Sequence, residues 1–239
     1  AYYGILKLGA TVVNFSPLYT VAELAHQVED SGTRVLFTLS ASALLPTALK
    51  VLDNSSLEKL VVGSIAEVLP TAKSILFRLF KRGETTPLPH DPRVIRYDRL
   101  IANSGECIVA DIDPVNDVAL LQYTGGTTGT PKGAMLTHRN LVANMQQASA
   151  WLGANQLERG KEIIITALPL YHIFALTACF LFFFRLGGCC LLIPNPRDLD
   201  GFVKTLSRTR FTNFAGVNTL FNALLEDPEF AKRDFSAMK

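Results

Sequence analysis

The sequence has little excess charge of either sign and few cysteines. Its 239 residues carry a formal net charge of +2, which gives no broad basic field for nucleic acid. The four cysteines lack metal-binding spacing, and the adjacent pair sits in an apolar run typical of strand packing. They are Cys107, Cys179, Cys189 and Cys190. This pattern argues against a disulfide scaffold or a metal site and favours the reducing cytosol.

The sequence also lacks a positively charged leader with a cleavage site. It begins at Ala1, without methionine, on residues typical of the last turns of a helix. We therefore expect a fragment of a longer protein. With 49% hydrophobic and 18% charged residues, its composition is that of a globular chain rather than a disordered one.

The sequence also lacks an uninterrupted membrane-spanning stretch. Residues 163–184 are apolar and long enough to resemble one. However, Pro169 interrupts the stretch, the β-branched residues before it favour a strand, and Gly187-Gly188 leads into another apolar strand. We therefore predict buried core here.

Short apolar strands and amphipathic helices alternate along the sequence, which predicts an α/β fold with mostly parallel sheets covered by helices. Because both faces of such sheets are covered, the strands are apolar throughout. Strands are predicted at 11–15, 34–38, 59–62, 118–121, 161–168 and 189–193, with a short one at 210–214. Helices are predicted at 1–8, 21–30, 41–52, 97–103, 138–151, 173–186, 198–208 and 217–225.

Several polar residues predict where helices begin and end. Thr20 and Glu23 form a capping-box pattern, and Thr137 precedes the helix that begins at His138. Ser40 is expected to open the helix at 41–52, and Pro228 to close the last helix. His138 is accordingly interpreted as a structural residue at a helix start.

Residues 65–83 interleave apolar side chains with lysines and arginines. Two interpretations fit: a helix lying on a membrane surface, or an amphipathic surface helix with a solvated basic edge. The proline-rich residues 85–93 then predict a connector that joins sub-units of about 1–83 and 111–239.

The stretch richest in candidate chemistry is residues 123–133, YTGGTTGTPKG. Its glycines allow backbone N–H groups to approach an anion, its threonines add hydroxyl donors, and Lys132 adds a positive charge. These groups predict a cradle for the phosphates of a nucleoside triphosphate. A glycine-threonine turn without a ligand is the alternative.

Two common nucleotide loops do not fit this stretch. A P-loop needs a Gly-Lys-Ser/Thr triplet, whereas Lys132 follows Pro131 and precedes Gly133. A dinucleotide fingerprint needs a different glycine spacing and an acidic residue on a following strand, so hydride transfer is not indicated.

Residues 124–133 instead resemble the signature loop of the adenylate-forming (AMP-binding) superfamily. Residues 168–176, LPLYHIFAL, resemble its second motif. Residues 216–225, GVNTLFNALL, and 14–20, NFSPLYT, are similar to bacterial long-chain fatty acid–CoA ligases. The resemblance spans essentially the whole sequence and implies an incomplete N-terminal domain of the acyl-CoA synthetase fold.

The resemblance implies that a fatty carboxylate attacks the α-phosphate of ATP, with Mg²⁺, and that CoA then displaces AMP. The loop would hold the departing phosphates through Thr124, Gly125, Gly126, Thr127, Thr128, Gly129 and Lys132. His172 would position the acyl carboxylate or gate its tunnel, since a carboxylate needs no general base. A buried structural histidine is the alternative.

The resemblance also implies that other parts of the site are absent from this sequence. The ribose-binding aspartate, the Mg²⁺-binding glutamate and the lysine of a mobile C-terminal domain would lie beyond Lys239, so the fragment alone should be inactive. The rival interpretations are a nucleotide-binding or membrane-associated module without ligase activity, and an unrelated ATP-hydrolysing enzyme. The expected location is the cytoplasm, with peripheral contact at the inner face of the membrane through 65–83.

Overall fold

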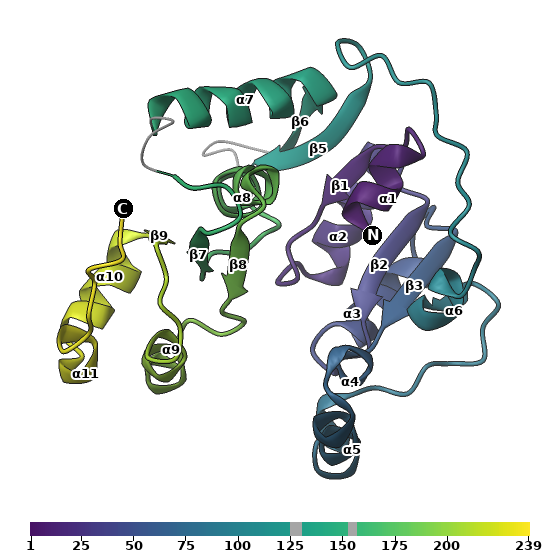
Figure 1. Ribbon diagram of the computed structural model, residues 1–239. Helices are drawn as coiled ribbons and strands as arrows, with labels where there is room; N and C mark the ends of the chain where they lie inside the picture. Colours follow the sequence, from purple (N-terminus) through teal and green to yellow (C-terminus); the bar gives the residue numbers. More distant parts are fainter. Residues whose placement is uncertain (125–130, 153–156) are drawn as a thin grey trace. The chain divides into compact units, whose positions relative to one another are not determined.

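The computed structural model describes residues 1–124, 131–152 and 157–239. These residues form two compact units. Unit 1 comprises Ala1–Asp111 and Tyr123–Gly133, and unit 2 comprises Ile112–Gln122 and Ala134–Lys239. Each unit is an α/β structure with its own parallel sheet, which confirms the predicted fold class (Figure 1).

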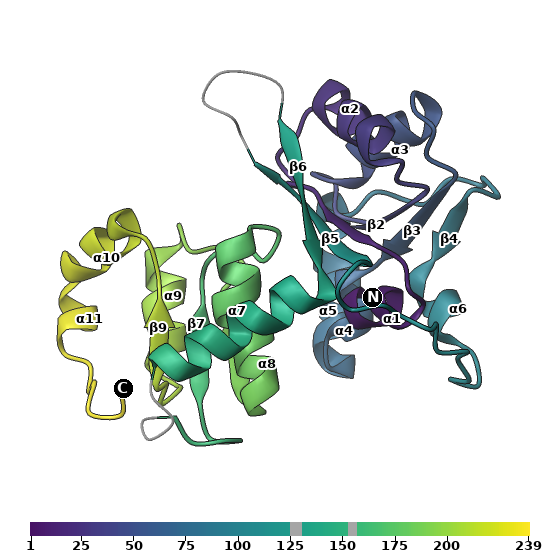
Figure 2. The ribbon, with the colours of Figure 1, turned by 90° about the horizontal axis from the view of Figure 1, so that it is seen from above.

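Unit 1 is built on a three-stranded parallel sheet. The strands are β2 (Val35–Leu39), β3 (Lys59–Gly63) and β4 (Val94–Arg96), in the order β2-β3-β4. Figure 2 shows α2 (Val21–Ser31) and α3 (Leu45–Asp53) on one side of this sheet and α6 (Tyr97–Ile101) on the other. Buried side chains of α2, α3 and β3 form one core: Leu24, Val28, Leu45, Val51, Leu52, Leu60 and Val62.

Local sequence signals fix the ends of α2. The Thr20 hydroxyl accepts from the Glu23 amide at 3.3 Å, and the Glu23 carboxylate accepts from the Thr20 amide at 2.8 Å, so the predicted capping box is present. The helix ends at Gly32, whose φ of 63° lies in the left-handed region where a Cβ would be strained. The predicted bounds of this helix are confirmed.

The basic segment of unit 1 forms separate short helices. These are α4 (Ile65–Val68), α5 (Thr71–Phe80) and the 3₁₀ turn η1 (Arg82–Glu84). None of the side chains of α5 is buried. The proline-rich residues that follow belong to unit 1, since the Thr86 amide donates to the Ser40 carbonyl at 2.8 Å and β4 pairs with β3.

Unit 2 contains a second three-stranded parallel sheet. Its strands are β7 (Ile163–Thr166), β8 (Cys189–Leu192) and β9 (Asn213–Ala215), in the order β8-β7-β9. Its helices are α7 (His138–Trp151), η2 (Ala175–Leu181), α8 (Phe182–Leu186), α9 (Leu199–Leu206), α10 (Asn218–Leu225) and α11 (Pro228–Ala231). One core joins β7 to α9, α10 and α11 through Ile165, Phe202, Leu206, Leu224 and Phe230.

The apolar stretch around Pro169 lies in the core of unit 2, as predicted. It forms β7, a turn, the π-helix η2 and α8 rather than one continuous helix. Ile164, Cys179, Phe182 and Phe183 are buried in one cluster. Among the described residues, no helix is both long and apolar enough to cross a membrane.

A third sheet has the order β1-β5-β6. Its strands are β1 (Val12–Asn14), β5 (Val118–Thr124) and β6 (Lys132–Thr137), and α1 (Tyr2–Lys7) precedes β1. Strand β6 was not predicted, although the helix start that follows it was. The Thr137 hydroxyl accepts from the Asn140 amide at 3.3 Å and opens α7 at His138.

Two predicted helix ends are wrong. Helix α3 begins at Leu45 rather than near Ser40, because the amide and carbonyl of Ser40 are bonded to Gly63 and Thr86 and so extend the sheet. Pro228 opens α11 instead of closing α10. The Asp227 carboxylate accepts from the amides of Glu229 and Phe230, so proline takes the first helical position, where no N–H is needed.

Candidate functional site

The predicted phosphate loop joins two neighbouring strands of the third sheet. Thr124 is the last residue of β5 and Lys132 is the first residue of β6, and both side chains are exposed. Thr124 and Lys132 therefore stand at the two ends of the loop, where their donors are open to a ligand. The other predicted phosphate-binding residues lie outside the described residues: Gly125, Gly126, Thr127, Thr128 and Gly129.

The strand residue directly before Thr124 is a buried tyrosine that is hydrogen-bonded to another element. The Tyr123 hydroxyl donates to the Asp30 carboxylate at 2.5 Å, which links β5 to α2 within unit 1. Burial, together with this carboxylate, raises the pKa of Tyr123 to about 12, so the hydroxyl stays protonated as a donor at neutral pH. The ring also lies against Gly133, where an added Cβ would be 3.3 Å from the tyrosine Cζ.

A buried glutamine connects β5 to the second motif. Gln122 is 6% exposed, and its Nε2 donates to the Tyr171 carbonyl at 3.1 Å, within unit 2. Two residues before Thr124, the strand is thus bonded to the turn that carries His172. A single amide inside the apolar strand of residues 118–123 indicates that some buried partner is needed, but it does not identify Tyr171.

His172 lies on the turn between β7 and η2. Its amide donates to the Pro169 carbonyl at 3.0 Å, and its carbonyl accepts from Leu176 at the same distance. The Nδ1 atom accepts from the Phe174 amide at 3.3 Å, which places the proton of the neutral ring on Nε2. The side chain is exposed, so the alternative of a buried structural histidine is wrong.

The position of this turn follows from the strand order. Thr166 at the end of β7 pairs with Leu192 of β8 and Ala215 of β9, so the chain leaves the sheet at the carboxyl end of its central strand. Ligands of open α/β sheets bind at this edge. His138, in contrast, is the first residue of α7, and its amide donates to the Asp117 carbonyl at 3.4 Å, in keeping with the predicted structural role.

The described residues contain no group of three or more His, Cys, Asp or Glu side chains that could hold a metal ion. The four cysteines are free. The chemistry that these residues offer is therefore that of hydroxyl, ammonium and imidazole groups at strand ends. Such groups suit binding of an anionic substrate.

Parallel α/β sheets with a glycine-threonine loop between two adjacent strands place the chain among α/β proteins whose sites lie on loops. The sequence pattern of the family described as AMP-binding enzyme matches residues 1–239, and the chain belongs to this family. The match covers both units and all of the motifs above.

Curated relatives and solved structures agree with this assignment. The chain is 46% identical over 242 residues to a long-chain-fatty-acid–CoA ligase of Escherichia coli O157:H7, which matches 100% of this chain and 42% of that protein. It is 34% identical over 251 residues to the ligase of the same description from Bacillus subtilis, with coverage of 100% and 42%. The chain thus spans less than half the length of these relatives.

Two solved structures share the fold at 24% identity, a level that establishes the fold alone. A long-chain-fatty-acid-CoA ligase from Archaeoglobus fulgidus matches with a TM-score of 0.71, covering 100% of this chain and 41% of that one. An anthranilate CoA ligase in complex with anthranoyl-AMP matches with a TM-score of 0.77 and the same coverage.

Proposed function

We propose that this chain is the N-terminal part of a long-chain fatty acid–CoA ligase. The ligase would activate a fatty carboxylate with ATP to an acyl-adenylate and transfer the acyl group to CoA. The observation that carries this proposal is the 46% identity along the whole chain to a bacterial ligase of that description. The loop motif fits the same reaction.

In this proposal the loop between β5 and β6 binds the phosphates that leave. Lys132 and Thr124 are exposed at its two ends and can donate to the β- and γ-phosphates. Backbone N–H groups of Gly125, Gly126 and Gly129 and the hydroxyls of Thr127 and Thr128 would complete the cradle. ATP would enter as its Mg²⁺ complex, whose metal ligands we do not assign to this chain.

His172 would orient the acyl carboxylate or gate its entry. An exposed imidazole whose Nδ1 accepts from a backbone amide has its Nε2–H free to donate to a carboxylate. General-base catalysis is not required of it, because the attacking carboxylate is already ionised near neutral pH. The other groups of the site are expected from the complete protein, since this chain spans 42% of the length of the ligase it matches.

The test is fatty-acid-dependent exchange of pyrophosphate into ATP by the complete protein. Loss of one electrostatic donor typically lowers a rate by about 10²-fold to 10³-fold, and we expect this loss for Lys132→Ala. Lys204→Ala is the matched control, since it removes an exposed lysine from α9 in unit 2. Exchange by Lys132→Ala within a few-fold of the parent would contradict the role of the loop.

The same assay separates the rivals. A nucleotide-binding module would bind ATP without any exchange, and an ATP-hydrolysing enzyme would release phosphate whether or not a fatty acid is present. A ligase requires the fatty acid for exchange and CoA for the second half of the reaction. Testing fatty acids of several lengths would define the substrate.

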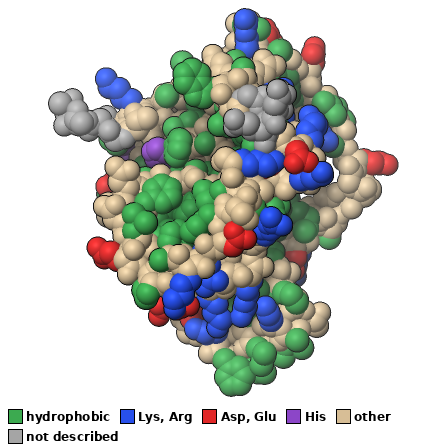
Figure 3. Space-filling model, turned by 60° about the vertical axis from the view of Figure 1, so that its left-hand side comes forward, with side chains coloured by type: hydrophobic (Ala, Val, Ile, Leu, Met, Phe, Trp, Pro, Cys, Tyr) green, Lys and Arg blue, Asp and Glu red, His purple; other side chains and the backbone are tan. Residues whose placement is uncertain are grey.

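We further propose peripheral contact with the inner face of the membrane through residues 65–83. The apolar side chains of α5 are exposed, with Phe80 at 78%, and lysines and arginines flank them. Figure 3 shows Lys and Arg side chains next to hydrophobic ones on the face that it draws. Such a surface binds anionic lipid both by burying its apolar side chains and by the attraction of its basic side chains to the lipid head groups.

Pelleting with vesicles that contain anionic lipid tests this contact. The triple variant Arg78→Gln, Lys81→Gln, Arg82→Gln should pellet less than the parent, and added salt should weaken the parent's binding. The matched control, Arg159→Gln, Lys204→Gln, Arg208→Gln, removes three exposed charges from unit 2. Equal pelleting of the parent and the triple variant of residues 78–82 would refute the contact.

A further inference from the structure

Unit 1 contains a cavity that none of the residues assigned above to the ligase reaction lines. It has a volume of about 940 Å³ and reaches Leu39 and Gly63, the last residues of β2 and β3, and Tyr97, which directly follows β4. It therefore lies at the carboxyl ends of the three parallel strands, the edge where open α/β sheets bind ligands. Helices α4, α5 and α6 supply most of the rest of its wall, and Ala1 also lines it.

Most of the side chains that line this cavity are apolar. They include Phe37, Leu39, Val61, Ile65, Leu69 and Ile75. The volume lies within the range of about 300–1,000 Å³ that is usual for small-molecule sites. An alkyl chain would gain by leaving water for these walls, because burial of each CH₂ contributes about 0.8 kcal/mol.

A smaller, polar cavity of about 390 Å³ adjoins the first one. The two share lining residues, among them Gly63, Ser64, Glu67 and Arg78. The smaller cavity adds a second guanidinium and several hydroxyls, from Arg96, Thr85, Thr86 and Ser40. The larger cavity is thus mostly apolar, and the neighbouring smaller one is rich in hydrogen-bond donors.

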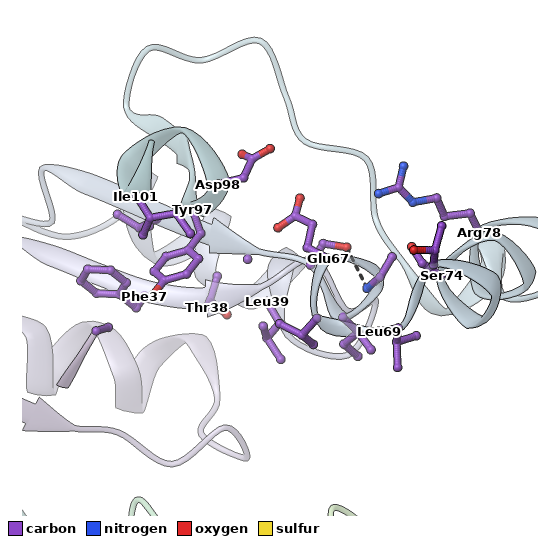
Figure 4. Close-up of a pocket in the computed structure, with 18 of the residues that line it drawn as sticks. Phe37, Thr38, Leu39, Glu67, Leu69, Ser74, Arg78, Tyr97, Asp98 and Ile101 are labelled. Carbon is purple, nitrogen blue, oxygen red and sulfur yellow. Dashed lines mark hydrogen bonds between the residues drawn. The ribbon is translucent and has the colours of Figure 1, made fainter. Parts of the chain in front are cut away.

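The ion pairs of this region leave one cation for a ligand. Arg96 binds the Asp98 carboxylate at 2.5 Å and lies 3.5 Å from the Glu67 carboxylate, so it neutralises both acids in part. Arg78 has no ion pair with any carboxylate in the described part of the chain. Figure 4 shows the charged ends of Arg78, Glu67 and Asp98 on one side of the pocket, and Leu39 and Leu69 on the other.

We propose that this site binds a single-chain anionic amphiphile, with its alkyl chain in the larger cavity and its carboxylate or phosphate head group at Arg78, which lines both cavities. The inference stands on the charges and walls of unit 1 and does not require the ligase reaction. Its residues are also different from those assigned to the reaction, the loop at 124–132 and His172. A lone alkyl chain without an anion would leave Arg78 unpaired and should bind more weakly.

Photolabelling of the complete protein tests the proposal. The probe is a palmitate that carries a photoreactive diazirine on its alkyl chain, and the readout is the labelled peptide found by mass spectrometry. We expect label within residues 61–78 and 97–101, which line the larger cavity. Labelling of the acyl site of the reaction would fall on other peptides, so the two sites are read separately.

Two substitutions should reduce this label. Ser74→Trp places a large side chain in the wall of the cavity, and Arg78→Gln removes the charge at its polar end. Because Arg78 is exposed, and an exposed ion pair typically contributes about 0.2–1 kcal/mol, Arg78→Gln should weaken binding by up to about fivefold. Lys73→Gln is the matched control, because this exposed lysine of α5 does not line either cavity.

Competition identifies the head group. Unlabelled palmitate and hexadecyl phosphate compete equally if the anion alone is recognised, whereas preference for one of them assigns carboxylate or phosphate as the ligand class. Hexanoate and hexadecanol, which lack the chain or the charge, should compete poorly.

Absence of label from these peptides, label that persists in both Ser74→Trp and Arg78→Gln, or equal competition by hexadecanol would each overturn the proposal. Absence of label would mean that another part of the complete protein fills the cavity. Circular dichroism of each variant checks that it folds, and Arg78→Gln together with the competition series decides the outcome if Ser74→Trp does not. Pyrophosphate exchange, measured separately, reports on the ligase proposal alone.

Discussion

Two apolar stretches of the sequence, residues 65–83 and 163–186, were each candidates for contact with a membrane. They differ in how far the structure buries them. The second stretch is buried in unit 2, where Phe182 is 2% exposed. The first leaves every side chain of α5 at least partly exposed. Interleaved lysines and arginines prevent burial of α5, because burying an unpaired charge costs more than its apolar neighbours gain.

The comparison shows that hydropathy alone does not decide whether an apolar stretch is buried in a core or lies on the surface. In the second stretch, the strand, the π-helix and α8 pack around one cluster of buried residues, with a proline in the turn before the π-helix and two glycines directly after α8. In the first, charged residues at every turn leave only a narrow apolar stripe. Such a stripe is suited to a surface or a partner rather than to a core.

Truncation of one phenylalanine in each stretch should give the largest difference between the two stretches in the free energy of unfolding. Phe182→Ala removes a fully buried ring and should lower the free energy of unfolding by about 3–5 kcal/mol. Phe80→Ala removes a ring that is 78% exposed and should change it by no more than about 0.5 kcal/mol. Urea denaturation followed by circular dichroism measures both, and equal losses would break the comparison.

The next largest expected effect is a pH dependence of stability that comes from a buried carboxylate directly before the second stretch. Glu162 is 1% exposed and accepts from Lys239 Nζ at 2.7 Å, from Asn213 Nδ2 at 2.9 Å and from the Glu158 amide at 2.6 Å. Burial by itself would raise the pKa of Glu162, but the hydrogen bonds from Lys239 and from the Glu158 amide lower it to about 2.

A lowered pKa stabilises the fold at a pH above the ordinary value of 4.5, and the contribution is lost as the pH falls toward 2. The loss should be at most about 3 kcal/mol, from 1.36 kcal/mol for each pKa unit. Urea denaturation at several pH values, compared with Glu162→Gln, measures it. If the parent and Glu162→Gln lose stability equally between pH 4.5 and 2, Glu162 is not the group that titrates.

Local signals predicted much of this fold because their causes are local. The Thr20–Glu23 box and Gly32 need only their own helix, and the bounds of α2 follow from them. Ser40 looked like a similar cap, but its backbone is bonded to Gly63 and Thr86, residues far along the chain. No short-range pattern contains that information.

The candidate site also combines features that local sequence predicts with contacts that it does not predict. The sequence placed Thr124 and Lys132 in a loop after a strand, and His172 just beyond the end of another strand, because strands and glycine-rich loops have clear local patterns. It did not reveal that Tyr123 bonds to Asp30 or that Gln122 bonds to the Tyr171 carbonyl. Both contacts join residues separated by dozens of positions, so they follow from packing rather than from local sequence.

A glycine at the end of the first stretch, Gly83, and one just after the second, Gly188, allow a further comparison of the two stretches, with smaller expected changes in the free energy of unfolding. At Gly188, an added Cβ would lie 2.9 Å from the Glu162 carbonyl oxygen, closer than real contacts allow, and at a tight 3.3 Å from the Phe183 ring. At Gly83, which follows α5, an added Cβ meets nothing within 4 Å, and the backbone is not left-handed. The same substitution therefore tests the packing around each stretch without changing the charge.

Gly188→Ala should lower the free energy of unfolding by about 1–3 kcal/mol, since the backbone around Glu162 must shift to accept the methyl group. Gly83→Ala should be neutral or raise it by up to about 1 kcal/mol, because alanine restricts the unfolded chain and is not opposed in the fold. Urea denaturation of the two variants gives the difference. A loss at Gly83 as large as that at Gly188 would mean that other parts of the complete protein pack on the segment after α5, and α5 would then no longer count as an open surface.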